Sequence, residues 1–403
     1  MARFLPKLVA EVSAITTFTY LIAMVLTVVL LASTPIGQDL LKNQGTLVLG
    51  AFLIPIYTPF RINLLGGFLA LFGIYVICFV AAVKSNGGFL TGLRGLFTGS
   101  TQQRVPNWLV VMPVASSALL LVVLAVTLVQ SAVGVSTGSL PPLEPYKLLY
   151  TLAYAPPLEE TMFRISTLGL LVALRVVWSS GPTPFGGNVG TMPSFVSETR
   201  CKNCGATLNP KQGEPVATCR YCGYAEAVGA APASQPRLSP ILRQHSTPRL
   251  IVLSFLFPEK AKSEAGLPTL NSNGWRAFHW TEWLVLILTS VGFGIAHLLS
   301  NVGWETGKVV TAALSGFALG LAYLSYGAYA SILLHWFFNV YFEVYSLGST
   351  FIGGAFVTVE VLVGLLVLAS GAIGIVAGIA RLASGEQGGG ETTYMTPSTF
   401  PPA

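Results

Sequence analysis

Charged residues are scarce in this chain. Only 9% of its 403 residues are Asp, Glu, Lys or Arg, whereas a typical soluble domain has about 25%. Hydrophobic residues make up 53% of the chain, and the mean hydropathy is +0.68. This composition excludes the soluble globular classes and indicates an integral membrane protein. The long apolar runs, without alternating ten-residue strands, favour membrane helices over a β-barrel.

The few charges are unevenly distributed. The net charge is +6, and residues 179–278 hold ten Lys or Arg and five Asp or Glu, so this segment alone accounts for +5. We interpret the excess as solvation of a soluble insert near an anionic membrane surface. The basic balance therefore gives little support to nucleic-acid binding.

Eight runs are apolar and long enough to cross a bilayer, which takes about 20 residues. They lie at about 12–34, 62–83, 107–133, 145–178, 280–299, 307–326, 328–347 and 351–381. The fourth run is interrupted by Pro156 and Pro157, and Pro157 is expected to begin a second helical half. The run at 46–58 is short and contains prolines, so a re-entrant or interfacial segment is expected there. The predicted fold is an all-α polytopic membrane protein with about eight transmembrane helices and a small zinc-ribbon insertion.

Breaks in composition divide the chain into four predicted parts. Residues 1–178 would hold the first four transmembrane helices, and residues 280–383 the last four. Between them, residues 179–279 read as a soluble insert with Gly-, Pro- and Ser-rich linkers. The tail at 384–403 is of low complexity and is expected to be disordered.

Four of the five cysteines form a compact module at about 199–226. Two CxxC pairs, each followed by glycine, are separated by fourteen residues; the cysteines are Cys201, Cys204, Cys219 and Cys222. This spacing predicts a structural zinc held by four thiolates, and it resembles a zinc ribbon. Two disulfides in an oxidising compartment are the alternative. The module is expected to recruit a protein partner, and nucleic acid is not favoured because no aromatic and basic stripe accompanies it.

The fifth cysteine and the remaining charges are set in apolar sequence. Cys78 reads as a buried small hydrophobe. Three apolar runs carry polar or aromatic residues four positions apart, and residues at i and i+4 share a helix face. They are Glu160 and Arg164 preceded by Glu159, then Phe293 and His297, then His335 and Asn339. Glu160 and Arg164 can form an ion pair, which leaves Glu159 outside that pair. Ionisable residues within membrane spans usually mark functional sites.

In this order, the EExxxR, FxxxH and HxxxN motifs resemble those of the CAAX protease and bacteriocin-processing family of intramembrane proteases. The resemblance covers about residues 145–347. It implies an endopeptidase that hydrolyses a peptide bond near the C-terminus of a lipid-linked or membrane-embedded protein. The substrate would be a protein or peptide in the membrane, lipidated or not.

The resemblance also implies a role for each residue. Glu159 would be the general base that deprotonates a water, and His297 would hold that water. His335 and Asn339 would donate hydrogen bonds to the oxyanion of the tetrahedral intermediate. Glu160 and Arg164 would orient Glu159, and Phe293 would pack the histidine helix. No catalytic metal is expected, so the ribbon zinc would be the cofactor.

Three alternatives stay open from the sequence. Glu159 and the two histidines could hold a catalytic zinc, although an HExxH motif is absent from the sequence. A non-catalytic membrane scaffold or immunity-type protein could use the same polar cluster to bind a ligand or partner. A transporter could use it as a proton relay, but no matching pair of interrupted helices indicates an inverted repeat.

The ribbon sets the expected orientation of the chain in the membrane. Free thiolates favour the cytosol for the ribbon. The chain is expected to be integral to the cell membrane and to cross it several times. His297 then lies about 25 Å along the fifth span, near its outer end.

Overall fold

The computed structural model describes residues 4–98, 106–180, 216–218, 225–227, 247–300 and 302–383. The chain divides into two compact units, Met1–Ser179 with Leu250–Ala403, and Ser180–Arg249. The second unit contributes one small antiparallel sheet to the description, formed by β3 (Val216–Thr218) and β4 (Ala225–Ala227). The four cysteines predicted to bind zinc and the tail at 384–403 lie outside the described residues.

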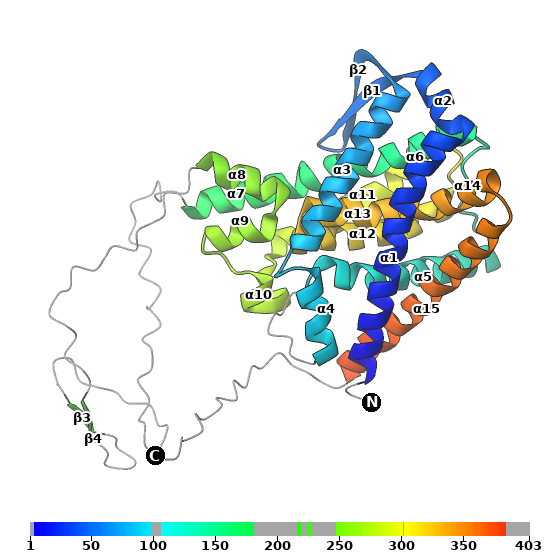
Figure 1. Cartoon of the computed structure of the whole chain (residues 1–403). Coiled ribbons are helices and arrows are strands. Elements are labelled where there is room, and N and C mark those ends of the chain that lie inside the picture. Colours follow the sequence, from blue (N-terminus) through cyan, green and yellow to red (C-terminus); the bar gives the residue numbers. More distant parts are fainter. Residues whose placement is uncertain are drawn as a thin grey trace. The chain divides into compact units, whose positions relative to one another are not determined.

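Helices dominate the first unit (Figure 1). Within the described residues, seven helices are long and apolar enough to cross a membrane. They are α1 (Phe4–Ser33), α3 (Leu64–Lys84), α5 (Trp108–Ala132), the continuous run of α6 (Pro145–Glu160), η1 (Thr161–Ile165) and α7 (Thr167–Ser180), then α11 (Trp280–Leu299), α12 (Thr306–Tyr326) and α15 (Ala355–Ala383). Together with their composition, these helices confirm an all-α polytopic membrane protein.

The seventh predicted run, at 328–347, is helical but irregular, and it is not among these seven helices. It consists of α13 (Ala328–Trp336), the π-helical η3 (Phe337–Tyr341) and α14 (Phe342–Ile352), which follow one another without a gap. Every residue of α13 is buried. This helix packs against α3, α6 and α12, so it forms the centre of the first unit. Cys78 of α3 is buried in the same core, as predicted.

The short apolar run at 46–58 forms part of a β-hairpin. After α2 (Pro35–Lys42), β1 (Gln44–Ala51) pairs antiparallel with β2 (Ile54–Asn63). The two residues at its tip, Phe52 and Leu53, have positive φ angles of 46° and 68°. A two-residue hairpin turn commonly requires this backbone, which residues with bulky side chains rarely adopt.

The hairpin tip is bound to the helix that carries the EExxxR motif. The Phe52 N–H donates to Ser166 Oγ at 2.8 Å, and the Leu53 N–H donates to the Met162 carbonyl at 3.3 Å. Further along β1, the Tyr154 hydroxyl bonds to the backbone of Val48. These contacts hold the strained turn and also bond a carbonyl of the π-helical segment η1.

The two prolines do not interrupt α6, contrary to the prediction. The helix continues through Pro156 and Pro157 to Glu160, and it becomes irregular only in η1. Pro157 has no N–H for the Ala153 carbonyl, but the Tyr75 hydroxyl of α3 donates to that carbonyl at 2.5 Å. A hydroxyl from a neighbouring helix therefore satisfies the carbonyl that the proline leaves free, as membrane helices often require.

The second compact unit is shorter than the insert predicted at 179–279. Residues from Leu250 onward belong to the first unit. They include most of α8 (Thr247–Leu256), then α9 (Pro258–Glu264), α10 (Leu270–Asn273) and the 3₁₀ turn η2 (Gly274–Ala277). Lys262 of α9 is fully buried and lies 2.9 Å from Glu282 Oε2 of α11. Arg175 of α7 lies 3.1 Å from the other oxygen of Glu282, so ion pairs join this segment to the membrane helices.

The α11–α12 interface is built on glycines. A Cβ at Gly294 would lie 2.3 Å from the Val309 carbonyl oxygen, and one at Gly320 would lie 2.2 Å from Leu286. Small residues allow membrane helices to approach closely. This approach brings the FxxxH helix next to α12, which contributes one wall of the candidate site.

Candidate active site

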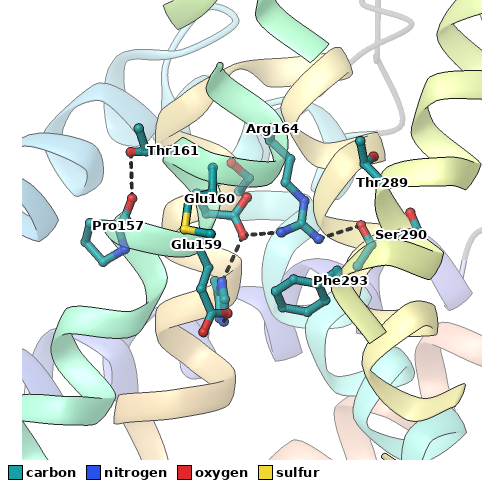
Figure 2. Close-up of polar contacts among 12 residues, drawn as sticks. Pro157, Glu159, Glu160, Thr161, Arg164, Thr289, Ser290 and Phe293 are labelled. Atoms are coloured by element: carbon teal, nitrogen blue, oxygen red, sulfur yellow. Dashed lines mark hydrogen bonds and ion pairs between the residues drawn. The ribbon is translucent and has the colours of Figure 1, made fainter. Parts of the chain in front are cut away.

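The predicted pair of Glu160 and Arg164 forms inside the first unit. Glu160 ends α6, and Arg164 lies in η1. Glu160 Oε1 is 3.1 Å from Arg164 Nη1, and both side chains are almost fully buried (Figure 2). A buried ion pair needs such geometry to offset the loss of hydration of both groups. The charges in EExxxR are thus partly neutralised within the motif.

Arg164 is held by two further groups from other helices. Its Nη2 donates to the Gly316 carbonyl of α12 at 3.0 Å. Its guanidinium lies 4.4 Å from the centroid of the Phe293 ring, which contributes a cation–π contact. A Cβ at Gly316 would lie 3.0 Å from Arg164 Nη2, so glycine is what allows the arginine to reach this carbonyl.

Glu159 points away from this pair, as its position on the helix predicts (Figure 2). The exposed fraction of its side chain is 25%, and its Oε2 atom lies 3.5 Å from His335 Nε2. That oxygen is nevertheless buried, and it has no hydrogen-bond partner among the described residues. Buried polar atoms are usually satisfied, so this oxygen requires an explanation.

His335 lies between the two glutamates. Its Nδ1 atom is 2.8 Å from Glu160 Oε1, and its Nε2 atom faces Glu159. Glu160, paired with Arg164, acts as a hydrogen-bond acceptor, so Nδ1 carries the proton and donates. In the neutral imidazole, Nε2 then has a lone pair that can accept a hydrogen bond.

His297 is fixed in a similar way on α11. Its Nδ1 lies 2.9 Å from the Phe293 carbonyl oxygen, which only accepts, so Nδ1 carries the proton here too. The Phe293 ring packs edge-on against both histidines, with centroids 4.7 Å from His297 and 5.8 Å from His335. Phe293 therefore contacts both imidazoles and the arginine.

A cavity of about 130 Å³ joins the histidine motifs. Its lining includes His297, His335 and Asn339, together with side chains of α5 and α12. Glu159 does not line this cavity, but it lies next to His335, which does. Within the parts of the chain that the structure describes, no group of three or more His, Cys, Asp or Glu side chains is arranged to hold a metal ion.

Both the EExxxR and the HxxxN helices become π-helical at their motifs. Arg164 lies in η1, and Asn339 lies in η3. Such segments are rare and frequently occur at functional sites. The sequence interpretation did not predict them, and Ser166 and Thr167, whose hydroxyls donate to the Met162 carbonyl in η1, are only a weak local signal.

Two residues of α12 were also missed. Gly316 begins a GxxxG pattern with Gly320, which is a recognised sign of close helix packing in membranes. Lys308 lines the cavity and is the only charged residue between 306 and 326. A lone charge in an apolar run was therefore the available signal for Lys308.

Comparison with known families agrees with the motifs. Residues 241–341 match the family model described as type II CAAX prenyl endopeptidase Rce1-like. This range includes FxxxH and HxxxN, whereas EExxxR precedes it. No curated protein and no solved structure matches the chain. Residues 241–341 are thus similar to the CAAX-type intramembrane proteases, and this similar region lies in a chain with seven apolar helices among its described residues.

Proposed function

We propose that the protein hydrolyses a peptide bond near the C-terminus of a membrane-embedded or lipid-linked protein, with Glu159 activating the attacking water. The observation that carries the proposal is the buried Oε2 atom of Glu159, which lacks a hydrogen-bond partner among the described residues and faces His335 Nε2 at 3.5 Å. A water molecule bound by both groups would satisfy them and stand next to the general base.

In the proposed reaction, the water oxygen attacks the carbonyl carbon of the scissile bond while Glu159 takes one of its protons. The carbonyl oxygen becomes the oxyanion of a tetrahedral intermediate. The intermediate then collapses, the C–N bond breaks, and Glu159 returns the proton to the leaving nitrogen. The products are a new carboxylic acid and a free amine, so one water is consumed for each bond.

The geometry favours a different role for His335 from the one that the family resemblance implies. Because its Nδ1–H is directed at Glu160, the neutral ring has no second proton to donate to an oxyanion. We assign His335 to the water, as an acceptor. The amide of Asn339, which needs no protonation to donate, remains the oxyanion donor in the same cavity.

Glu160, Arg164 and Phe293 are positioning residues in this scheme. Glu160 orients His335 through Nδ1, and Arg164 balances the charge of Glu160. Phe293 packs against His297 and His335 and holds the arginine from the other side. His297 is assigned to the same water or to the substrate carbonyl region.

A metal-dependent form of the same reaction is the second candidate. Both histidines direct Nδ1–H at an acceptor, Glu160 or the Phe293 carbonyl, and leave Nε2 free of a proton. Metal-binding histidines are commonly oriented in this way. A metal at the two Nε2 atoms would polarise the water or the carbonyl oxygen.

We also propose that Cys201, Cys204, Cys219 and Cys222 bind one structural zinc and that this ribbon lies in the cytosol and recruits substrate or a partner. The support is the CxxC spacing in the sequence. Replacing Cys201 and Cys204 by serine should lower the zinc content of the purified protein from one atom per chain to none. Unchanged zinc in that variant would contradict the assignment.

Proteolysis in liposomes tests the catalytic proposal. The substrates are C-terminal peptides with a prenyl chain, an acyl chain or no lipid. Wild type is compared with Glu159→Gln, His335→Ala and, as a matched control, Glu144→Gln, an exposed carboxylate outside the cavity. We expect cleavage by wild type and the control only. Unimpaired cleavage by Glu159→Gln would reject Glu159 as the base.

Chelation separates the two forms of the reaction. The glutamate mechanism is supported if activity survives a membrane-permeant chelator. Metal analysis of the treated protein must then show less than one metal atom per chain beyond the ribbon zinc. Activity lost with the chelator and regained with zinc supports the metal-dependent form. If wild type cleaves none of the peptides while still binding a partner through the polar cluster, a scaffold function replaces both.

A further inference from the structure

A lysine in the cavity has no role in the proposed reaction. Lys308, in the first turn of α12, lines the same cavity as His297, His335 and Asn339. Among the described residues, no carboxylate lies within ion-pair distance of its ammonium, which lies 4.0 Å from the centroid of the Trp304 ring. A partly buried ammonium within membrane sequence usually has a functional reason.

The position of Lys308 relative to the reacting groups is well defined. Trp304 lies between the lysine and the histidine, with its ring centroid 6.4 Å from that of His297. Lys308 and His297 also line the same cavity. Lys308 is therefore a neighbour of the catalytic groups and makes no direct bond to them.

The start of α12 is held in place by the loop that follows α5. Ser139 N–H donates to the Gly303 carbonyl at 3.1 Å, and Gly307 N–H donates to the Ser136 carbonyl at 2.9 Å. A Cβ at Gly138 would lie 2.2 Å from the Gly303 carbonyl oxygen, so the two segments pack backbone to backbone. Such contacts fix the base of the lysine side chain and restrict where its ammonium can reach.

The wall that α12 gives to the cavity changes polarity along its length. Five residues on one side of the helix line it; they are Lys308, Thr311, Ala312, Ser315 and Leu319. The charged and hydroxyl side chains lie between Lys308 and Ser315, and the wall ends in the apolar Leu319; Val123 and Phe338 add apolar lining from other helices. Eleven residues separate Lys308 from Leu319, about 16 Å along the helix. The cavity thus has one cationic end and one apolar end.

We propose that Lys308 binds a carboxylate of the substrate at the cationic end of the cavity. The proposal rests on the proposed function. The carboxylate could be the α-carboxylate at the end of the chain or an acidic side chain, and both offer the same charge-assisted hydrogen bond. A cation held on an aromatic face next to the active site would then select substrates with an anionic end.

Lys308 could instead act on the enzyme, by stabilising the charge of Glu159. The two roles differ in a measurable way. A lysine that acts on Glu159 affects every substrate equally, whereas a lysine that binds substrate affects only those with the carboxylate. The ratio of kcat/KM between matched substrates therefore separates them, whatever the size of the overall effect.

The test uses the full-length protein in liposomes and a peptide that wild type cleaves, made in three forms. The first ends in a free carboxylate, the second in a carboxamide, and the third in a carboxamide with glutamate as its last residue. Lys308→Gln and Lys308→Arg are compared with wild type. Lys147→Gln is the matched control, because Lys147 is exposed and pairs with Glu144 outside the cavity.

We expect wild type to prefer the free-acid peptide over the carboxamide by about tenfold to a hundredfold, the range for a hydrogen bond to a charged group. Lys308→Gln should bring that ratio close to one, and Lys308→Arg and Lys147→Gln should keep it. If wild type also prefers the third peptide over the plain carboxamide, an acidic side chain is sufficient for recognition by Lys308.

Three outcomes overturn the inference. A wild-type ratio near one means that the carboxylate is not recognised, although the proposed function stands. Equal losses on all three peptides in Lys308→Gln assign the lysine to Glu159. Failure of wild type to cleave any form of any peptide rejects the proposed function, and the inference with it.

Discussion

The Nδ1 atom of His335 lies 2.8 Å from Oε1 of Glu160, although 175 residues separate the two in the chain. The same carboxylate oxygen receives Arg164 at 3.1 Å. One oxygen thus joins the EExxxR helix to the HxxxN helix, and the two motifs form a single polar cluster. Removing Glu160 should disturb a histidine and an arginine at once.

Glu160→Gln should therefore lower both activity and stability. Arg164 would keep its charge in a buried site without its partner, and breaking a buried pair in this way typically costs about 3–5 kcal/mol. Thermal unfolding in detergent and the kcat of wild type and variant measure the two effects. We expect a lower unfolding temperature and a fall in kcat of at least tenfold.

A double variant separates packing from chemistry. Glu160→Met with Arg164→Met removes both charges and should regain much of the lost stability, since apolar replacements of buried pairs are often tolerated. Its activity should stay low, because His335 no longer has an acceptor for Nδ1–H. Activity that returns together with stability would show that Glu160 has only a packing role.

Gly316→Ala tests whether the arginine needs the close approach of α12. The added Cβ would lie 3.0 Å from Arg164 Nη2 and 3.1 Å from the Phe293 ring. Such contacts are tight enough to displace the guanidinium, so we expect lower kcat with little change in KM. Gly364→Ala in α15 is the control, because nothing lies within 4 Å of its added Cβ. Equal kinetics in the two variants would contradict the positioning role.

The sequence predicted the pairing of side chains in the site better than its local backbone. Residues four apart share a helix face, so the pairing of Glu160 with Arg164 and the separation of Glu159 from that pair followed from periodicity. The family resemblance linked the three motifs across the chain. Two features of α12 were not predicted: Lys308 in the cavity wall, and the packing glycine Gly316. A single lysine or glycine in an apolar run has many explanations.

The departures from the predicted fold have local physical causes. The prolines of α6 were expected to interrupt the helix, but the Tyr75 hydroxyl, distant in sequence, satisfies the freed Ala153 carbonyl. The π-helical segments depend on similar long-range contacts, such as the bond from Leu53 N–H to the Met162 carbonyl. Periodicity along one segment does not contain this information. It does predict well which type of element a long apolar run forms.

Leu53→Gly tests the strain at the hairpin tip. Leu53 has a φ of 68°, and a left-handed backbone costs a non-glycine residue roughly 1–2 kcal/mol. Glycine removes that strain but loses more conformational entropy on folding, about 0.5–1 kcal/mol. We expect a small net gain in stability, measured by thermal unfolding.

Leu53→Val is the companion variant, because β-branched residues tolerate positive φ least. It should unfold at a lower temperature than wild type. Since the Leu53 N–H bonds to Met162 in η1, this variant should also have a lower kcat. A valine variant as stable as wild type would mean that the tip does not keep this backbone.

A pH effect on stability is expected outside the membrane helices, at Glu259 of α9. Burial raises the pKa of this carboxyl above its usual 4.5, and the Leu270 N–H and the Lys262 ammonium offset the rise only in part. The folded protein therefore binds this proton more tightly than the unfolded chain does. Stability from this group is present below pH 4.5 and is lost as the pH rises through the raised value.

Glu259→Gln should remove this loss, because a neutral amide oxygen can still accept from the Leu270 N–H without a buried charge. We expect the variant to unfold at a higher temperature than wild type at pH 7, and the difference to shrink toward pH 4.5. Glu144→Gln is a control of opposite sign, since a hydrogen bond from Lys147 lowers the pKa of Glu144 and makes its ionised form the favourable one in the fold. Thermal unfolding of the three proteins between pH 4.5 and 7 measures both trends. A constant difference between Glu259→Gln and wild type across that range would show that Glu259 does not titrate there.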